Sequence, residues 1–151
     1  MNGRALWDQD GYSIYSASTT ADAMAFMQTY ATAELPVAKF TAGVDFSGFE
    51  PLTSTSSSGV WGAAVGSDKS VLGWFRDATS EPPNWVVSPK VSEQTVTITV
   101  PGTVANWRVD FYDTKTGTKI LSSASVTRQG NTVTISLPDF QDDIAFKLYA
   151  Q

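Results

Sequence analysis

Aromatic rings beside carboxylates near the start of the chain are the first residues whose types could do chemistry. Trp7, Asp8, Asp10, Tyr12 and Tyr15 lie close together in the sequence. Flat rings cover the apolar C–H face of a sugar, and carboxylates accept hydrogen bonds from its hydroxyl groups. The cluster therefore predicts a sugar-binding surface on Trp7 and Tyr12, with Asp8 and Asp10 fixing orientation. For Tyr15 we favour packing of the N-terminal arm onto the fold, and sugar contact is the alternative.

A second candidate for sugar contact is Trp85, which follows Pro82, Pro83 and Asn84. Loops run over the surface, and the fixed φ of proline stiffens them. We expect the Trp85 ring to be held toward solvent, with Asn84 hydrogen bonding to a stacked sugar. The alternative is that Trp85 folds back as a lid over one edge of a sheet.

The residue types that are absent exclude several classes of function. The 151 residues include no His and no Cys, so catalytic triads, histidine or thiolate metal sites and disulfides cannot form. The formal net charge of −5 argues against nucleic acid, which requires a basic patch. No apolar run approaches the ~18 residues of a membrane span. We expect neither nucleic acid nor membrane as a partner.

The sequence contains two acidic clusters, and one of them is a candidate metal site. Asp8-Gln9-Asp10-Gly11 resembles the opening of a calcium loop, but Thr19 stands where an EF-hand loop needs its bidentate Glu. We therefore expect no metal site and no cofactor. The alternative is a structural calcium ion. The other cluster is predicted to be a solvated turn or cap and consists of Asp139, Asp142 and Asp143.

The elements that position these residues begin with one helix. A start that resembles a capping box at 19–22, followed by apolar residues at helical spacing, predicts a helix over about residues 20–33. Pro36 is expected to end it. Residues 41–59 are rich in Gly, Ser and Thr and are predicted to be a loop.

Beyond residue 59 the apolar residues recur with a period of two, which is typical of half-buried antiparallel strands. Turn residues separate the segments, and Gly66–Lys69 has the composition of a hairpin turn. The predicted strands lie at about residues 60–65, 71–75, 95–100, 107–112, 132–137 and 144–148.

Two tryptophans on these strands are predicted to be buried. Trp107 alternates with polar residues and shares a face with Val109 and Phe111. Trp74 belongs to a strand that is apolar on both faces, and the pattern does not place Trp61. The polar face of the Trp107 strand is predicted to be solvated, or alternatively to line a shallow groove at Tyr112; it carries Arg108, Asp110 and Tyr112.

The pattern as a whole predicts a mainly β chain that forms an antiparallel β-sandwich with one N-terminal helix. The length suits a single domain over residues 1–151. Within it we expect an N-terminal arm and helix at 1–39 and the sandwich at 40–151.

Three segments of the sandwich carry a resemblance to known proteins. They are VLGWFRD at 71–77, VDFYDTKTG at 109–117 and LPDFQDDIAF at 137–146. Together they resemble the small β-sandwich that follows the (β/α)8 barrel in some glycoside hydrolases, including relatives of family five. A free-standing sandwich of this kind is similar to carbohydrate-binding modules of family eighty-one. The resemblance covers about residues 40–150, and residues 1–39 look like the remnant of a final barrel strand and helix.

This resemblance implies a carbohydrate-binding module rather than an enzyme. Such a module would bind β-glucan polysaccharides or oligosaccharides, of the cellulose, mixed-linkage glucan or xyloglucan type. It would hold a glycoside hydrolase domain of the same parent chain near its substrate. The barrel enzymes use two glutamates, and here Glu50-Pro51 is preceded by Phe49, so that no Asn-Glu-Pro context exists. We expect the protein to be extracellular. The sequence shows no signal peptide, so this expectation assumes that the leader has been removed.

Two alternatives remain at the level of the sequence. One is a structural accessory sandwich that shields the barrel and has no ligand of its own. The other is a small carboxylate hydrolase that uses Asp8 or Asp10.

Overall fold

The computed structural model describes residues 20–80, 86, 88–121 and 123–151 of the chain. In this part the chain is mainly β, and its single helix, α1 (Thr20–Thr41), precedes the strands. The strands are β1 (Glu50–Leu52), β2 (Ser54–Ser56), β3 (Val60–Gly66), β4 (Ser70–Asp77), β5 (Thr95–Thr99), β6 (Asn106–Tyr112), β7 (Ala124–Thr127), β8 (Thr132–Ser136) and β9 (Asp143–Ala150).

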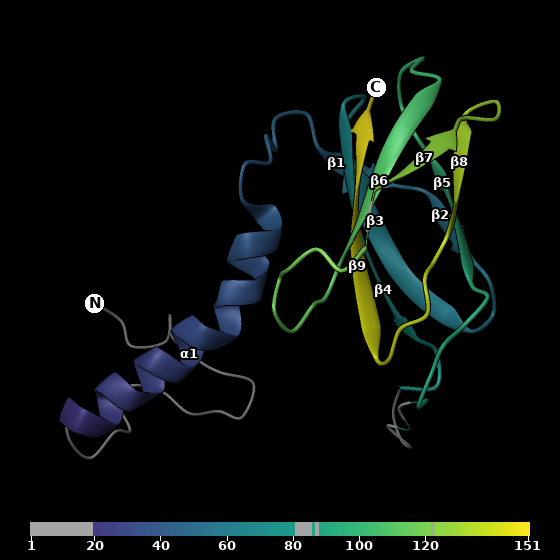
Figure 1. Cartoon of the computed structure of the whole chain (residues 1–151). Coiled ribbons are helices and arrows are strands. Elements are labelled where there is room, and N and C mark those ends of the chain that lie inside the picture. Colours follow the sequence, from purple (N-terminus) through teal and green to yellow (C-terminus); the bar gives the residue numbers. More distant parts are fainter. Residues whose placement is uncertain (1–19, 81–85, 87, 122) are drawn as a thin grey trace.

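The strands form two antiparallel sheets that pack face to face (Figure 1). The larger sheet has the order β1-β3-β4-β9-β6-β7, and the smaller has the order β2-β5-β8. The predicted antiparallel β-sandwich with one N-terminal helix is therefore confirmed. The predicted hairpin is also present, because β3 pairs with β4 from Val60 opposite Asp77 to Gly66 opposite Val71.

The core fills the space between the sheets and is centred on the ring of Phe146. This ring stacks on Phe75 at 5.9 Å between centroids and meets Phe111 edge-on at 6.4 Å. A Cβ atom at Gly73 would lie 2.2 Å from Cζ of Phe146, so only glycine allows the ring to lie this close to β4. The predicted core positions of one β6 face are confirmed, because all three side chains are buried: Trp107, Val109 and Phe111.

The prediction of a loop over residues 41–59 is wrong for two short segments, which form β1 and β2. Strand β2 belongs to a stretch of Ser and Thr with no apolar alternation. Its conformation is set by backbone pairing with β5, in which Ser54 lies opposite Ile98 and Ser56 opposite Val96. Such pairing depends on a distant strand, so the local pattern does not reveal it.

The prediction that α1 ends before Pro36 is also wrong, because the helix continues through this residue to Thr41. Proline removes one backbone hydrogen bond from a helix. The turn that follows it is stabilised by packing, since Phe40 meets the ring of Tyr112 edge-on at 5.2 Å. A tertiary contact thus outweighs the local preference at Pro36.

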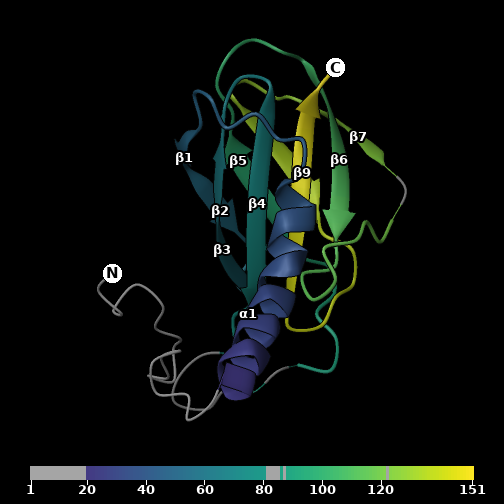
Figure 2. The same ribbon diagram turned by 90° about the vertical axis from the view of Figure 1, so that its left-hand side faces the viewer.

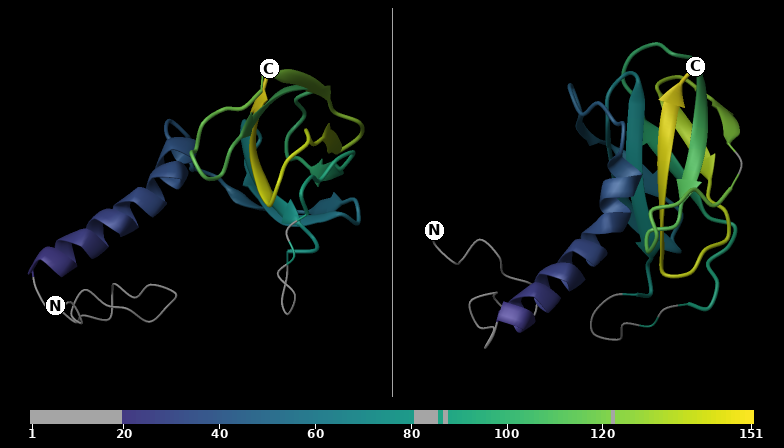
Figure 3. Two further views of the ribbon diagram at one scale, coloured as in Figure 1. Left: turned by 60° about the horizontal axis from the view of Figure 1, so that its bottom comes forward. Right: turned by 60° about the vertical axis from the view of Figure 1, so that its left-hand side comes forward.

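The C-terminal end of α1 lies against the sandwich, where Phe40 contacts Tyr112. Figure 2 shows α1 in front of the outer face of the six-stranded sheet. The rest of the helix projects away from the sheets (Figure 3). It exposes several large apolar side chains, including Met24, Met27 and Leu35. No helical segment in the described residues combines the length and the apolar character needed to cross a membrane.

The core assignment predicts a large loss of stability for Phe111→Ala. The ring is buried between the sheets, so its removal should lower the free energy of unfolding by about 3–5 kcal/mol. Phe46→Ala is the matched control, because the Phe46 side chain is 51% exposed and should cost under about 1 kcal/mol. Urea unfolding of both variants measures the difference, and equal losses would contradict the assignment.

Candidate functional site

The residues that the sequence singles out for sugar contact all lie outside the described residues. They are Trp7, Asp8, Asp10, Tyr12, Tyr15, Asn84 and Trp85. Their roles in sugar contact therefore stay predictions from the sequence.

The two ends of the segment that carries Asn84 and Trp85 are nevertheless described, and both are bound to Asp77. This carboxylate accepts a hydrogen bond from the backbone N–H of Thr79 at 2.8 Å and another from that of Ser88 at 2.7 Å. Thr79 Oγ1 also donates to the carbonyl of Val86 at 3.0 Å. Asp77 therefore anchors both ends of the segment to the end of β4.

Two tryptophans lie next to each other on the outer face of the six-stranded sheet. Trp61 on β3 is 40% exposed, and Trp74 on β4 is 38% exposed. Their rings meet edge-on with centroids 5.8 Å apart. We call Trp61 and Trp74 the tryptophan pair. It presents aromatic surface to solvent on two paired strands.

The exposure of Trp74 corrects the prediction that it is core. Side chains alternate along a strand, so Phe75 points between the sheets and Trp74 points away from them. The three-stranded sheet covers only the inner face. Apolar residues on both faces of β4 therefore reflect a core on one side and a half-exposed surface on the other.

Polar groups border the tryptophan pair. Trp74 Nε1 donates a hydrogen bond of 2.9 Å to Asp143 Oδ2, and Thr114 Oγ1 donates to Asp143 Oδ1. The guanidinium of Arg76 lies 5.5 Å from the ring centre of Trp61, within the range of a cation–π interaction. Arg76 also donates to Ser80 Oγ at 2.6 Å. Asp143 was predicted to be part of a solvated turn, and instead it fixes the orientation of Trp74.

An apolar groove of about 490 Å³ begins at Trp74 and runs between α1 and the sheet. Its floor includes Leu72 and Ala145, and Val65 lines it on β3. The last turns of α1 form one wall with Pro36, Val37 and Phe40. The loop after β6 lines the groove with Asp113, Thr114 and Gly117. The volume is within the range of ligand-binding pockets.

The α1 wall of the groove is fixed by a buried lysine between two rings. Lys147 Nζ lies 5.2 Å from the ring centre of Phe40 and 4.9 Å from that of Tyr112, and the residue is only 4% exposed. Burial lowers the pKa of Lys147, and Asp110 opposes this effect. Burial raises the pKa of Tyr112 to about 12, with a further contribution from its hydrogen-bond partner Tyr149. The prediction that this face of β6 is solvated is thus wrong at Tyr112. The alternative, in which Tyr112 lines a groove, is correct.

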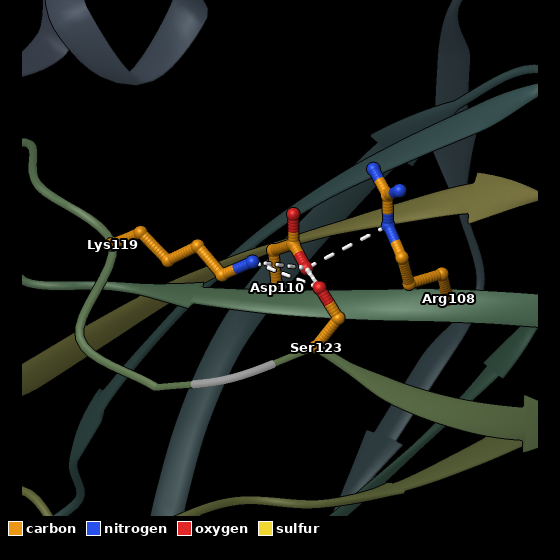
Figure 4. A network of polar contacts seen from close by, with 4 residues as sticks. All are labelled: Arg108, Asp110, Lys119 and Ser123. Atoms are coloured by element: carbon orange, nitrogen blue, oxygen red, sulfur yellow. Dashed lines mark hydrogen bonds and ion pairs between the residues drawn. The ribbon is translucent and has the colours of Figure 1, made fainter.

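Asp110 on the same face is also buried, which the prediction of a solvated face missed. Its Oδ1 atom accepts hydrogen bonds from Ser123 Oγ at 2.6 Å and Lys119 Nζ at 3.0 Å, and Arg108 Nε lies 3.7 Å away (Figure 4). Burial raises the pKa of this carboxyl, but the bonds from Ser123 and Lys119 outweigh it and lower the pKa below its usual value. Asp110 therefore stays charged and ties the loop before β7 to β6.

In the described part of the chain, no group of three or more acidic side chains is arranged to hold a metal ion. The groups that border the tryptophan pair and the groove can stack, accept and donate hydrogen bonds.

The chain was compared with family models, curated proteins and solved structures. No family model matches the chain, and no curated protein matches it. The chain is similar to the solved structure of alpha-L-fucosidase isoenzyme 2 from Paenibacillus thiaminolyticus, with a TM-score of 0.42 and 12% sequence identity. The match covers 67% of this chain and 15% of that one, so this chain spans only a small part of that protein's length.

The environment of Asp77 predicts a specific dependence of stability on pH. Burial raises the pKa of this carboxyl, but hydrogen bonds from Ser88 and Thr79 outweigh burial and lower it to about 2. A folded-state pKa below the unfolded one stabilises the protein above the unfolded value of 3.8. This stabilisation should be lost as the pH falls from about 4 to about 2.

We expect Asp77→Asn to lower the free energy of unfolding at pH 7 and to make its decline between about pH 4 and pH 2 shallower. Urea unfolding across this range measures both effects. Asp139→Asn is the control, because Asp139 forms an exposed ion pair with Lys90 and should contribute little at pH 7. An unchanged slope in Asp77→Asn would show that the carboxylate does not anchor the segment.

Proposed function

We propose that this chain is a non-catalytic carbohydrate-binding module that binds a neutral β-glucan by stacking sugar rings on the tryptophan pair. The observation that carries the proposal is the adjacent, half-exposed placement of Trp61 and Trp74 on one sheet face. Large indole rings are normally buried when they serve only the fold. Two of them exposed side by side favour a ligand.

The physical reason for stacking lies in the hydration of sugars. A hydrogen bond that replaces one to water contributes only about 1 kcal/mol net. Covering the C–H face of a pyranose with an indole ring removes two apolar surfaces from water. Affinity should therefore depend mainly on the rings, while Arg76 at their border orients the sugar hydroxyls.

Four aromatic residues outside the described part of the chain remain sequence-based candidates for sugar contact. They are Trp7, Tyr12, Tyr15 and Trp85.

We further propose that the module serves a linked glycoside hydrolase domain of a secreted parent chain. The gain would come from a raised effective concentration of the enzyme at its substrate. The apolar side chains that α1 exposes support contact with a neighbouring domain. They equally favour the alternative, a structural accessory sandwich without a ligand, and only binding experiments separate the two.

Removal of one indole ring of the tryptophan pair should weaken binding and leave the fold intact. We expect Trp61→Ala and Trp74→Ala each to reduce the affinity for a cello-oligosaccharide about tenfold, or ~1.4 kcal/mol. The melting temperature should change little, because both rings are half exposed. Calorimetric titration and a thermal melt measure the two quantities.

Phe46→Ala provides the matched control for loss of an exposed ring, because Phe46 does not line the groove. Trp85→Ala tests the sequence-based prediction for Trp85 separately. Binding should also change little with salt, since a neutral glycan carries no charge. Unaltered affinity in both Trp61→Ala and Trp74→Ala would remove the tryptophan pair from the site, and a chain that binds no glycan would favour the structural alternative.

The proposal of a non-catalytic role predicts that the purified chain releases no reducing sugar from any β-glucan. The only acidic pair with a proposed catalytic use is Asp8 and Asp10. A reducing-sugar assay over cellulose derivatives, mixed-linkage glucan and xyloglucan tests this. Turnover that is lost in Asp8→Asn or Asp10→Asn would support the hydrolase alternative instead.

A further inference from the structure

The groove is continuous with the tryptophan pair but offers a different chemistry. Trp74 belongs to both, because its ring contacts Trp61 and also lines the groove. On the tryptophan pair, a sugar can keep its hydroxyl groups in water. Inside the groove, the same sugar would have to exchange that water for protein groups.

The polar side chains of the groove already have partners. Asp143 accepts from Trp74 and Thr114. Asp113 Oδ1 accepts from the backbone N–H of Thr116 at 2.8 Å. Thr41 Oγ1 donates to the carbonyl of Val37 at 2.8 Å, and Tyr112 is hydrogen bonded to Tyr149. The polar lining therefore serves the protein itself, and the remaining lining is apolar.

This composition disfavours a hydroxyl-rich ligand in the groove. A buried hydroxyl that finds no hydrogen-bond partner destabilises the complex, because it gives up its bonds to water. A methyl group in the same place loses no hydrogen bond, and its burial is favoured by the hydrophobic effect. The two carboxylates at the groove end, Asp113 and Asp143, also repel an anionic group.

We infer that the groove receives an uncharged apolar substituent, such as an O-methyl or O-acetyl group, of the neutral glycan that stacks on the tryptophan pair. The inference rests on the proposed function, because it assigns the groove as a specificity subsite of the same surface. The glycan backbone lies on Trp61 and Trp74. Its substituent points from Trp74 toward Leu72, Val65 and the α1 wall. The protein would thereby prefer a substituted polysaccharide over an unsubstituted one.

A matched pair of ligands tests this inference. The probes are a cello-oligosaccharide and the same oligosaccharide carrying O-methyl groups, each titrated into the full chain by calorimetry. We expect the methylated probe to bind about tenfold more tightly. Equal affinity for the two probes would overturn the inference and leave the proposed function standing, whereas no binding of either would overturn the proposed function as well.

A variant that fills the groove separates the subsite from the platform. Val65→Phe adds a ring at a half-exposed strand position that lines the groove. It should abolish the preference for the methylated probe and preserve the affinity for the bare one. Ser125→Phe adds the same ring at an exposed β7 position outside the groove and should leave the preference intact.

Two further results would overturn the inference. One is a preference for the methylated probe that persists in Val65→Phe, because the substituent would then bind elsewhere. The other is a change of oligomeric state in Val65→Phe, measured by sedimentation, which would assign the groove to contact between two copies of the chain.

Discussion

The ring of Phe146 is the contact on which the arrangement of the larger sheet depends. It stacks on Phe75 of β4, meets Phe111 of β6 and occupies the space that a side chain at Gly73 would need. These contacts fix which residues of β4, β9 and β6 point between the sheets. Strand alternation then forces the intervening residues to the outer face. The exposure of Trp74 and the position of Asp143 beside it are consequences of the packing around Phe146.

The outer face is divided by α1 into two regions of different character. Near Trp61 the face is open, and rings and polar groups stand in solvent. Beyond Trp74 the last turns of α1 cover the sheet, because Phe40 packs on Tyr112 and over Lys147. The same contact that prolongs the helix past Pro36 builds the wall of the groove. The same docking contact thus adds an apolar groove to an otherwise open sheet face.

Much of the fold could be predicted from the sequence because it depends on local alternation. Alternation predicts that Trp107, Val109 and Phe111 lie in the core, and the turn residues predict the hairpin between β3 and β4. Alternation assigns residues to two faces, but it does not tell which face a second sheet covers. Trp74 was misassigned for this reason, since its strand is apolar on both faces.

The candidate site was less accessible to sequence reasoning, because its parts come together only in the folded chain. Phe40 and Tyr112 are far apart in sequence, and no local pattern predicts that they meet. Asp143 looks like one of several acidic turn residues until β9 is placed beside β4. The spacing of Trp61, Ala63 and Val65 indicates that they share one face of their strand. It does not tell whether this face points toward the core or toward solvent.

The central claim, that sugar binds on the tryptophan pair, is most directly tested by the indole N–H signals of the five tryptophans in a ¹H–¹⁵N correlation spectrum. The signals can be assigned with single Trp→Phe variants and followed while a cello-oligosaccharide is added. The account predicts that the signals of Trp61 and Trp74 shift with ligand concentration, while that of Trp107, which is buried in the core, stays in place. Binding that leaves the Trp61 and Trp74 signals unmoved would contradict it.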